Sequence, residues 1–595
     1  MTLVNTAQLA EIAAAYSATN ITFFGAGSDN PLGADGPGGG LVAAVERRGV
    51  VPIAAHLAPG ERMLLADAGV TLELRRVPDG VRLRVEWDDG PAYVDHVPFA
   101  ASATPLPLHA SSAKTLDTPG TESAVAVIPS APAVTDITPE TLGSPRFRAV
   151  HDVGCCYVQG AMAGGIASAS MVTAMAQAGL LGFFGAGGLP LEIVDSAIGE
   201  IVAGVDGRPF GANLLHNPME PAVEEKTVDI YLRHGVSTVS ASAFMQLTPA
   251  IVRYRLAGIH QGPNGEVVTP HRIFAKVSRP EVAAQFMRPA PKRIVDQLVE
   301  SGVLSKTEAA WAAKVPMAED ITAEADSGGH TDRRPLSVLL PTLLRLRDQI
   351  CEEESYPEGM QAIRVGAAGG LGEPTAMWGA FAMGADYVLT GSVNQATSEA
   401  GTSELAKEML MASGMADCAT GPAPDMFEIG AHVQVLGRGS MYAQRAERLY
   451  RAYKSCDSIA DIPGPEKAKI EKTIFKMSFE EVWSITEAYW SERDPTEVAR
   501  AEKDGKHKMA LCFRWYLGMT SRWARTGEKA RKRDFQIWCG PSMGAFNDWV
   551  KGSWLEPLDA RDVVSVAHAL MDGVAALGNA HASGQTAVSA VPPRR

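Results

Sequence analysis

Residues 363–392 read IRVGAAGGLGEPTAMWGAFAMGADYVLTGS and contain two short apolar runs separated by one helical pattern. Each run ends in a stretch of mostly small residues. The first stretch is residues 366–372, and the second is Thr390-Gly391-Ser392. Small residues at the end of a strand let a ligand reach backbone N–H groups, and the following helix directs its positive end at the same spot. This stretch therefore predicts two neighbouring parallel strands that share an anion site.

The same alternation of short apolar runs and helical patterns extends over residues 147–397. Eight apolar runs alternate with helical patterns, which is typical of a TIM (β/α)8 barrel, and about 250 residues is the usual size of that fold. The predicted strands are residues 155–159, 180–184, 210–215, 236–241, 273–277, 321–325, 363–367 and 387–390. The predicted helices are residues 168–178, 191–202, 221–234, 249–257, 281–286, 335–350 and 373–383, with an eighth beginning near Ser398. A doubly wound sheet competes with the barrel, but no GxGxxG motif follows the first run with an acidic residue about 20 positions on.

The rest of the chain divides into further segments. Residues 1–98 form a small module in which alternation over residues 63–87, around Pro78-Asp79-Gly80, predicts a β-hairpin. Residues 99–146 are rich in Ala, Ser, Thr and Pro and predict a flexible linker. Three more segments are a helical insertion at about 288–316, a helical extension at 398–560 and a C-terminal tail at 561–595 that is expected to fray from about 575. The aromatic residues of the extension, Trp538 among them, are interpreted as core packing. The predicted fold class is thus α/β.

Composition excludes several classes of protein. The chain has 595 residues and a net charge of −14, which argues against nucleic-acid binding and favours two or three domains. Seven cysteines without a CxxC motif predict reduced thiols and no metal site. Residues 153–191 carry no charge and are long enough to cross a bilayer, but their recurrent glycines favour a buried strand–helix–strand unit. We therefore expect a cytoplasmic protein that binds no membrane.

TIM barrels carry their working residues at the C-terminal ends of the strands. The seventh predicted strand brings Ala368, Gly369 and Gly370 to that end, and the eighth brings Gly391 and Ser392. Glycine-rich loops after strands seven and eight form the common phosphate site of this fold, although tight turns alone can also explain such glycines.

The sixth predicted strand ends near Asp326, Gly328, Gly329 and His330. A histidine at the barrel mouth can donate a hydrogen bond or transfer a proton near neutral pH, or it can simply brace its loop. The fifth strand carries Lys276, which could face either a bound ring or a carboxylate such as Asp326.

Four stretches of the barrel resemble the flavin-dependent nitronate monooxygenase and enoyl-reductase superfamily. They are GAMAGGIASASMVTAMAQAGLLGFFGAGGLPLE from residue 160, PFGANLLHNP from 209, EADSGGHTDRRP from 324 and VGAAGGLGEPTAMWGAFAMGADYVLTGSVNQ from 365. The segment FQIWCGPSMGAFNDWVKGSWLEP from residue 535 is absent from simpler members. With it, residues 140–560 resemble more narrowly the PfaD-type enoyl reductases, which act in trans in polyunsaturated-fatty-acid synthases and trans-acyltransferase polyketide synthases.

The resemblance implies FMN as cofactor, NADPH or NADH as reductant and an enoyl thioester on an acyl carrier protein as substrate. Synthase modules and a second copy of the chain, in a homodimer, are the implied partners. By the same resemblance, Gly328, Gly329 and His330 match an element beside the flavin, and Ala368–Gly370 with Gly391-Ser392 match the phosphate loops. The isoalloxazine contacts correspond to Gly160, Ala161, Met162 and Asn213, with packing as the alternative for Met162. Here Asp326-Ser327 separates Glu324-Ala325 from the Gly-Gly-His element, whereas the superfamily often has Glu-Ala directly before it.

In this interpretation His330 is the proton donor or polarises the thioester oxygen. Two alternatives remain, namely a nitronate monooxygenase-like FMN oxidase with His330 as base, and a non-catalytic flavoprotein component of a synthase. Docking of an acidic carrier protein to an acidic chain needs a local basic patch. Arg333-Arg334 is one candidate. The other is a run that can also be a solvated helix face, formed by Arg522, Arg525, Lys529, Arg531, Lys532 and Arg533.

Overall fold

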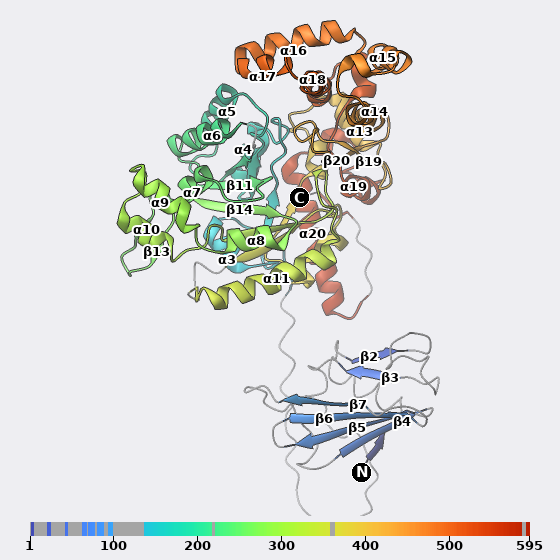
Figure 1. The fold of residues 1–595 in the computed structure, drawn as a ribbon. Coiled ribbons are helices and arrows are strands. Elements are labelled where there is room, and N and C mark those ends of the chain that lie inside the picture. The colour runs from blue at the N-terminus through green and yellow to red at the C-terminus, as the bar shows by residue number, and fades with distance from the viewer. Residues whose placement is uncertain are drawn as a thin grey trace, which may run out of the picture. The chain divides into compact units, whose positions relative to one another are not determined.

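The computed structural model describes residues 136–216, 220–356, 363–585 and 591–594, together with strands inside residues 1–98 (Figure 1). The chain divides into two compact units, Met1–Pro129 and Ser130–Arg595. The strands of the first unit are β1 (Thr2–Val4), β2 (Ile21–Phe24), β3 (Val42–Val45), β4 (Arg62–Asp67), β5 (Val70–Val77), β6 (Gly80–Trp87) and β7 (Tyr93–Pro98). β5 and β6 pair antiparallel with Val77 opposite Gly80, which confirms the predicted hairpin. Residues 99–135 of the predicted linker lie outside the described residues.

Eight strands of the second unit close into a parallel barrel, which confirms the predicted TIM fold (Figure 1). They are β8 (Tyr157–Gln159), β9 (Leu181–Phe184), β10 (Gly211–Leu215), β11 (Thr238–Ser242), β14 (Arg272–Val277), β15 (Asp320–Glu324), β17 (Arg364–Ala368) and β18 (Val388–Thr390). Each pairs with the next barrel strand along the chain, and β18 pairs back to β8 with Thr390 opposite Gln159. Parallel strands covered on both faces are apolar throughout, so their sequences read as runs rather than alternations.

A short helix closes the N-terminal end of the barrel. This helix, α3 (Pro145–His151), buries Phe147 completely, and the Phe147 ring stacks on Tyr387 with the centroids 4.6 Å apart. Leu142, just before the helix, is also buried. The prediction that residues 99–146 are a flexible linker is therefore wrong for the residues at its end, because they carry the apolar side chains that plug the barrel.

A buried ionic cluster lies at the same end. Asp320 accepts hydrogen bonds from Arg364 Nε and Nη2 at 2.7 Å and lies 2.9 Å from His151 Nε2. Asp320 and Arg364 are the first residues of their strands, so the cluster is opposite the end where this fold performs chemistry. The neighbouring Arg364 and His151 charges outweigh the cost of burial and hold the pKa of Asp320 well below its usual range. This cluster is structural, and we exclude it from the candidate site.

Seven helices follow barrel strands in the predicted order. They are α4 (Ala169–Gln177), α5 (Leu191–Gly204), α6 (Pro221–Arg233), α7 (Pro249–Leu256), α8 (Pro280–Met287), α11 (Leu336–Glu353) and α12 (Pro374–Ala382). The predicted insertion forms α9 (Lys292–Glu300) and α10 (Lys306–Ala312), and β12 (His260–Gln261) pairs with β13 (Val267–Val268) before β14.

The eighth helical position is taken by α20 (Val563–Ala582), which packs against both α12 and α4. Two expectations are therefore wrong: the eighth barrel helix does not begin near Ser398, and residues 561–595 are not merely a tail. Val566, Leu570 and Val574 of α20 are fully buried, so the helix completes the outer ring after a long excursion of the chain. Among the described residues, α20 is also the helix whose length and apolar composition would allow it to cross a membrane, and most of it is buried inside this unit.

The excursion forms the helical extension. Its helices are α13 (Glu404–Met411), α14 (Tyr442–Ser455), α15 (Gly464–Ile470), α16 (Phe479–Arg493), α17 (Pro495–Ala501), α18 (Gly505–Thr526) and α19 (Ser542–Val550). β19 (Cys418–Pro422) and β20 (His432–Leu436) form a small sheet with β16 (Gly329–His330) from the barrel, and Val435 of β20 bridges to Trp538. Buried Tyr442 belongs to the extension's own core, as expected for its aromatic residues, but Tyr489 is 53% exposed, so the core-packing expectation is wrong for that residue. The extension is thus tied to the barrel mouth through the strand that carries His330.

Candidate active site

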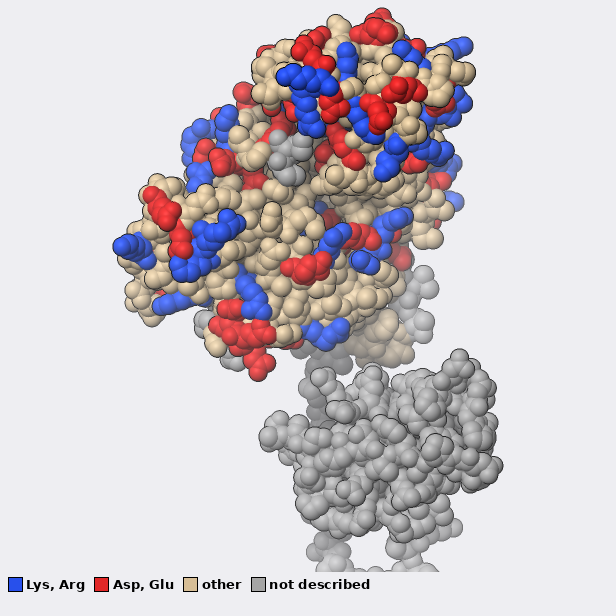
Figure 2. Space-filling view, viewed as in Figure 1, with Lys and Arg blue, Asp and Glu red and all other residues tan. Residues whose placement is uncertain are grey.

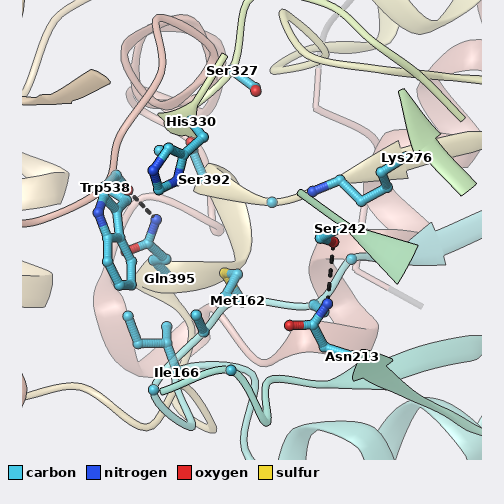
Figure 3. A pocket seen from close by; sticks show the side chains of 18 of the residues that line it. Met162, Ile166, Asn213, Ser242, Lys276, Ser327, His330, Ser392, Gln395 and Trp538 are labelled. Atoms are coloured by element: carbon cyan, nitrogen blue, oxygen red, sulfur yellow. Dashed lines mark hydrogen bonds between the residues drawn. The ribbon is translucent and has the colours of Figure 1, made fainter. Parts of the chain in front are cut away.

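A cavity of about 400 Å³ lies at the C-terminal ends of the barrel strands. The predicted site residues that line it are Gly160, Ala161, Met162, Asn213, Lys276, Gly328, Gly329, His330, Gly369, Gly391 and Ser392. His330, Gln395 and Trp538 lie on one side of the view in Figure 3, and Asn213, Ser242 and Lys276 on the other. The structure thus brings most of the predicted residues to one site.

Gly369, Gly391 and Ser392 line this cavity from the loops that follow the neighbouring strands β17 and β18. Gly369 has φ +86°, and an added Cβ would lie 2.7 Å from the Ala325 carbonyl carbon, so glycine is required there. An added Cβ at Gly391 would meet no atom within 4 Å, so Gly391 borders open space. Ser392 Oγ accepts a hydrogen bond from the Gly540 N–H at 3.0 Å. The backbone of these loops therefore leaves room for an anionic group.

Three predicted site residues are not among the residues that line the cavity: Asp326, Ala368 and Gly370. Ala368 ends β17 and is buried in the barrel core. Asp326 Oδ1 accepts from Gln434 Nε2 at 3.0 Å, which ties its loop to β20. These two side chains are occupied by packing or hydrogen bonding, so a contact of Ala368 with an anion would come from its backbone N–H, and the predicted role of Asp326 stays a prediction.

Met162 and Asn213 also line the cavity. Met162 also belongs to the main hydrophobic core, so packing explains its burial, and its contact with a flavin stays a prediction. Asn213 Nδ2 donates to the Ser240 carbonyl at 2.9 Å and to Ser242 Oγ at 3.1 Å (Figure 3). Because these bonds occupy the amide nitrogen, the amide oxygen can accept a hydrogen bond from a ligand.

Lys276 pairs with Glu324, with Nζ 2.9 Å from Oε1. Both side chains line the cavity. The sequence left open a bound ring and a carboxylate such as Asp326 as partners of Lys276; the carboxylate that pairs with it is Glu324, and contact with a ring stays a prediction. Lys276 of β14 lies opposite Thr322 of β15 in the sheet. Glu324 is two residues after Thr322 on β15, so its side chain points to the same face of the sheet as that of Thr322.

His330 lies at the mouth of the cavity, with its Nε2 3.1 Å from Asp425 Oδ1 and 41% of its side chain exposed. Burial lowers the pKa of His330, but the hydrogen bond and charge of Asp425, with a smaller contribution from Glu324, outweigh burial and the opposing charge of Lys276. The pKa of His330 is therefore raised above its ordinary value. The pKa of Asp425 lies below its usual range, because its ion pair with His330 outweighs its own burial. The pair favours a protonated imidazole, which suits an acid.

The extension supplies wall residues that the sequence did not predict. They are Pro424, Asp425, Gly518, Ser521, Arg525, Gln536, Trp538 and Ser542. Asp425 is 95 residues from His330 in the chain, so no local pattern could indicate their pairing. The core-packing interpretation of Trp538 is incomplete, because this residue lines the cavity and its carbonyl accepts a hydrogen bond from Gln395 Nε2 (Figure 3). The signal in the sequence that could have indicated these wall residues was the resemblance of the segment from residue 535 to the PfaD-type enoyl reductases.

The cavity walls contain polar atoms that lack a protein partner. Within the described part of the chain, Arg525 Nε, Gln536 Nε2 and Trp538 Nε1 are buried without a hydrogen-bond partner. Unpaired buried polar atoms are costly and rare in folded proteins, and they accumulate where a ligand supplies the partner. Together with the open space at Gly391 and the volume of the cavity, they fit a phosphorylated ring cofactor such as FMN.

Comparisons with known proteins find relatives of both the barrel and the extension. A family model described as nitronate monooxygenase matches residues 150–421, and one described as the inserted helical domain of [acyl-carrier-protein] S-malonyltransferase matches residues 456–535. The crystal structure of the enoyl reductase domain of MlnA, from the macrolactin biosynthesis cluster of Bacillus amyloliquefaciens, superposes with a TM-score of 0.72 at 36% identity. It covers 75% of this chain and 99% of that domain.

Two curated proteins are similar over most of the second unit. One component of the polyunsaturated fatty acid synthase of Thraustochytrium sp. is 44% identical over 418 residues, which are 70% of this chain and 28% of that protein. Polyketide biosynthesis protein PksE of Bacillus subtilis is 43% identical over 442 residues, which are 74% of this chain and 57% of that protein. The chain therefore spans less than two thirds of the length of these relatives.

The barrel, the glycine loops after β17 and β18 and the histidine at the mouth define a TIM-barrel oxidoreductase of the nitronate monooxygenase class. The chain belongs, within that class, to the PfaD-type enoyl reductase family of polyunsaturated-fatty-acid and polyketide synthases.

Proposed function

We propose that this chain is an FMN-dependent enoyl reductase. It uses NADPH or NADH to reduce the α,β double bond of an enoyl thioester carried by an acyl carrier protein, in polyketide or polyunsaturated-fatty-acid biosynthesis. The observation that supports the proposal is the His330–Asp425 pair, because Asp425 raises the pKa of an imidazole at the mouth of a cavity that glycine-rich loops line. The names of the relatives, which are synthase components and an enoyl reductase domain, support the substrate class.

The residues that line the cavity can be assigned to the two polar parts of FMN, its phosphate and the edge of its ring. Gly369, Gly391 and Ser392 would surround its phosphate, and Asn213 and the Lys276–Glu324 pair would contact the polar edge of the ring. When bound, FMN supplies the hydride, taken from the nicotinamide, that forms the new C–H bond at the β-carbon. The protein contributes orientation and electrostatics.

The remaining proton comes from the protein. Hydride addition at the β-carbon leaves negative charge on the α-carbon and the thioester oxygen, and one proton at the α-carbon completes the saturated acyl group. His330, held protonated by Asp425, is positioned to donate that proton or to polarise the oxygen. The neutral imidazole then regains a proton from water, to which its side chain is partly exposed.

A nitronate monooxygenase-like oxidase is the second candidate, favoured by the family model over residues 150–421. That chemistry uses His330 as a base, which requires the neutral imidazole, whereas Asp425 stabilises the protonated form. The two functions are separated by measuring NADPH consumption with a crotonyl thioester and O2 uptake with an alkyl nitronate. We expect the first to be much the faster, and the reverse order would overturn the proposal.

The proposed setting is the cytoplasm, with synthase modules and their carrier proteins as partners and with a homodimer as the assembly. Figure 2 shows Lys and Arg interspersed with Asp and Glu over the visible face, without a large basic surface.

The exchange Asp425→Asn provides a test through pH. Because Asp425 raises the pKa of His330, its loss should lower that pKa, and the protonated form needed as donor should disappear at lower pH. We expect the alkaline limb of the profile of kcat/KM against pH to move to lower pH, with the larger loss of activity above neutrality. Asp417→Asn is the matched control, because Asp417 pairs with exposed Arg438 and does not line the cavity. An unchanged alkaline limb in the Asp425 variant would refute the role of the pair.

A further inference from the structure

The six basic residues between 522 and 533 do not form one surface patch. Arg531 is buried, and its guanidinium donates to the carbonyls of Ile474 and Phe475, so it is structural. Lys529, Lys532 and Arg533 are exposed but do not line the cavity. Arg525 lines the cavity, and exposed Arg522 lies three residues before it on α18. The predicted basic patch is therefore not one surface. Arg531 is structural, Lys529, Lys532 and Arg533 are solvated, and Arg525 belongs to the cavity wall.

One face of α18 forms part of the cavity wall. Gly518, Ser521 and Arg525 follow at spacings of three and four residues, which places them on the same side of the helix. An added Cβ at Gly518 would meet no atom within 4 Å. Glycine is unfavourable in the middle of a helix, so its presence there, facing open space, indicates room for a ligand to approach the helix closely.

The charge of Arg525 is not compensated by the protein. Its Nη1 donates to the Gly164 carbonyl at 2.7 Å, and its Nε is buried without a partner. No carboxylate in the described part of the chain lies within ion-pair distance of it. Burial and then the neighbouring charge of Arg522 lower the pKa of Arg525. A desolvated cation without a counter-charge is unfavourable, and an anionic ligand would remove that penalty.

We propose that Arg525, with Arg522 beside it on the Gly518–Ser521 face of α18, binds a phosphate ester of a molecule that enters the cavity. This inference rests on the proposed function, in which two reactants carry such a group: the 4′-phosphopantetheine arm of the carrier protein, and the nicotinamide nucleotide. A guanidinium binds phosphate strongly through charge-assisted N–H donors, and Arg525 Nη2 has no hydrogen-bond partner in the described part of the chain. The phosphate of FMN is assigned to separate loops, at Gly369 and Gly391.

The test is a binding measurement on the full chain loaded with FMN. Isothermal titration with 4′-phosphopantetheine, pantetheine and NADP⁺ is made on the parent, Arg525→Gln, Arg525→Lys and Lys532→Gln. We expect the parent to bind 4′-phosphopantetheine about tenfold more tightly than pantetheine, as one charge-assisted contact provides. Arg525→Gln should abolish this difference, Arg525→Lys should keep part of it, and Lys532→Gln should leave it intact.

Each other outcome has a defined meaning. If Arg525→Gln weakens NADP⁺ binding and leaves the pantetheine pair unchanged, the phosphate ester is that of the nucleotide. If it changes neither ligand, or if it releases FMN, the inference is overturned. Because none of these ligands reacts, the measurement is independent of turnover. A parent that discriminates the phosphate but fails to reduce a crotonyl thioester would refute the proposed function alone.

Discussion

Replacement of His330 by alanine is expected to lower kcat for reduction of a crotonyl thioester by roughly 10²- to 10⁴-fold, the usual contribution of a positioned general acid. Asp425 raises the pKa of this imidazole at the cavity mouth, and removal of the imidazole leaves the α-carbon to be protonated by water. FMN should remain bound, because the cavity end at Gly369 and Gly391 is untouched. The measurement is single-turnover oxidation of the prereduced flavoprotein by the thioester.

The matched control is the same histidine-to-alanine exchange at a residue outside the cavity. His432 is a partly exposed histidine on β20 that does not line the cavity, and its Nδ1 lies 2.9 Å from the Gly430 carbonyl. His432→Ala should therefore turn over at the parental rate. A His330→Ala protein that is fully loaded with FMN and reduces the thioester as fast as the parent would remove His330 from the mechanism.

The sequence predicted the parts of the fold that depend on local pattern. Each barrel strand is an apolar run because both its faces are covered, and the glycine at 369 is required by a positive φ and a close backbone contact. α20 was missed as the eighth barrel helix because its Ala-rich sequence fits a tail as well as a helix. Residues 563–582 form a barrel helix because they pack between α12 and α4, and no local sequence pattern describes that long-range packing.

The same reasoning separates the predicted from the missed parts of the site. Residues from one strand end, such as Gly328 to His330, come together because neighbours in sequence are neighbours in space. Asp425, Arg525 and Trp538 reach the cavity only because the extension folds over the barrel mouth, through β16, β20 and the bridge from Val435. Their roles are set by a long-range contact, and the acidity of His330 is set by one of them.

Gly391→Asp is expected to abolish FMN binding while leaving the fold intact. A side chain at this position would meet no protein atom within 4 Å of its Cβ and would enter the space assigned to the phosphate. A carboxylate placed beside a phosphate costs several kcal/mol, so the affinity for FMN should fall on the order of 100-fold or more. The measurements are the flavin absorbance that remains after desalting and the thermal midpoint of the protein without FMN.

The same exchange at Gly379 is the control for this test. Gly379 lies in α12, an added Cβ there also has no atom within 4 Å, and the residue does not line the cavity. Gly379→Asp should therefore keep its FMN, although an aspartate inside a helix lowers stability slightly. Since both sites accept the added atoms and only one faces the cavity, loss of FMN at residue 391 alone locates the phosphate. A Gly391→Asp protein that stays yellow would place the phosphate elsewhere, and with it the orientation of the flavin relative to His330.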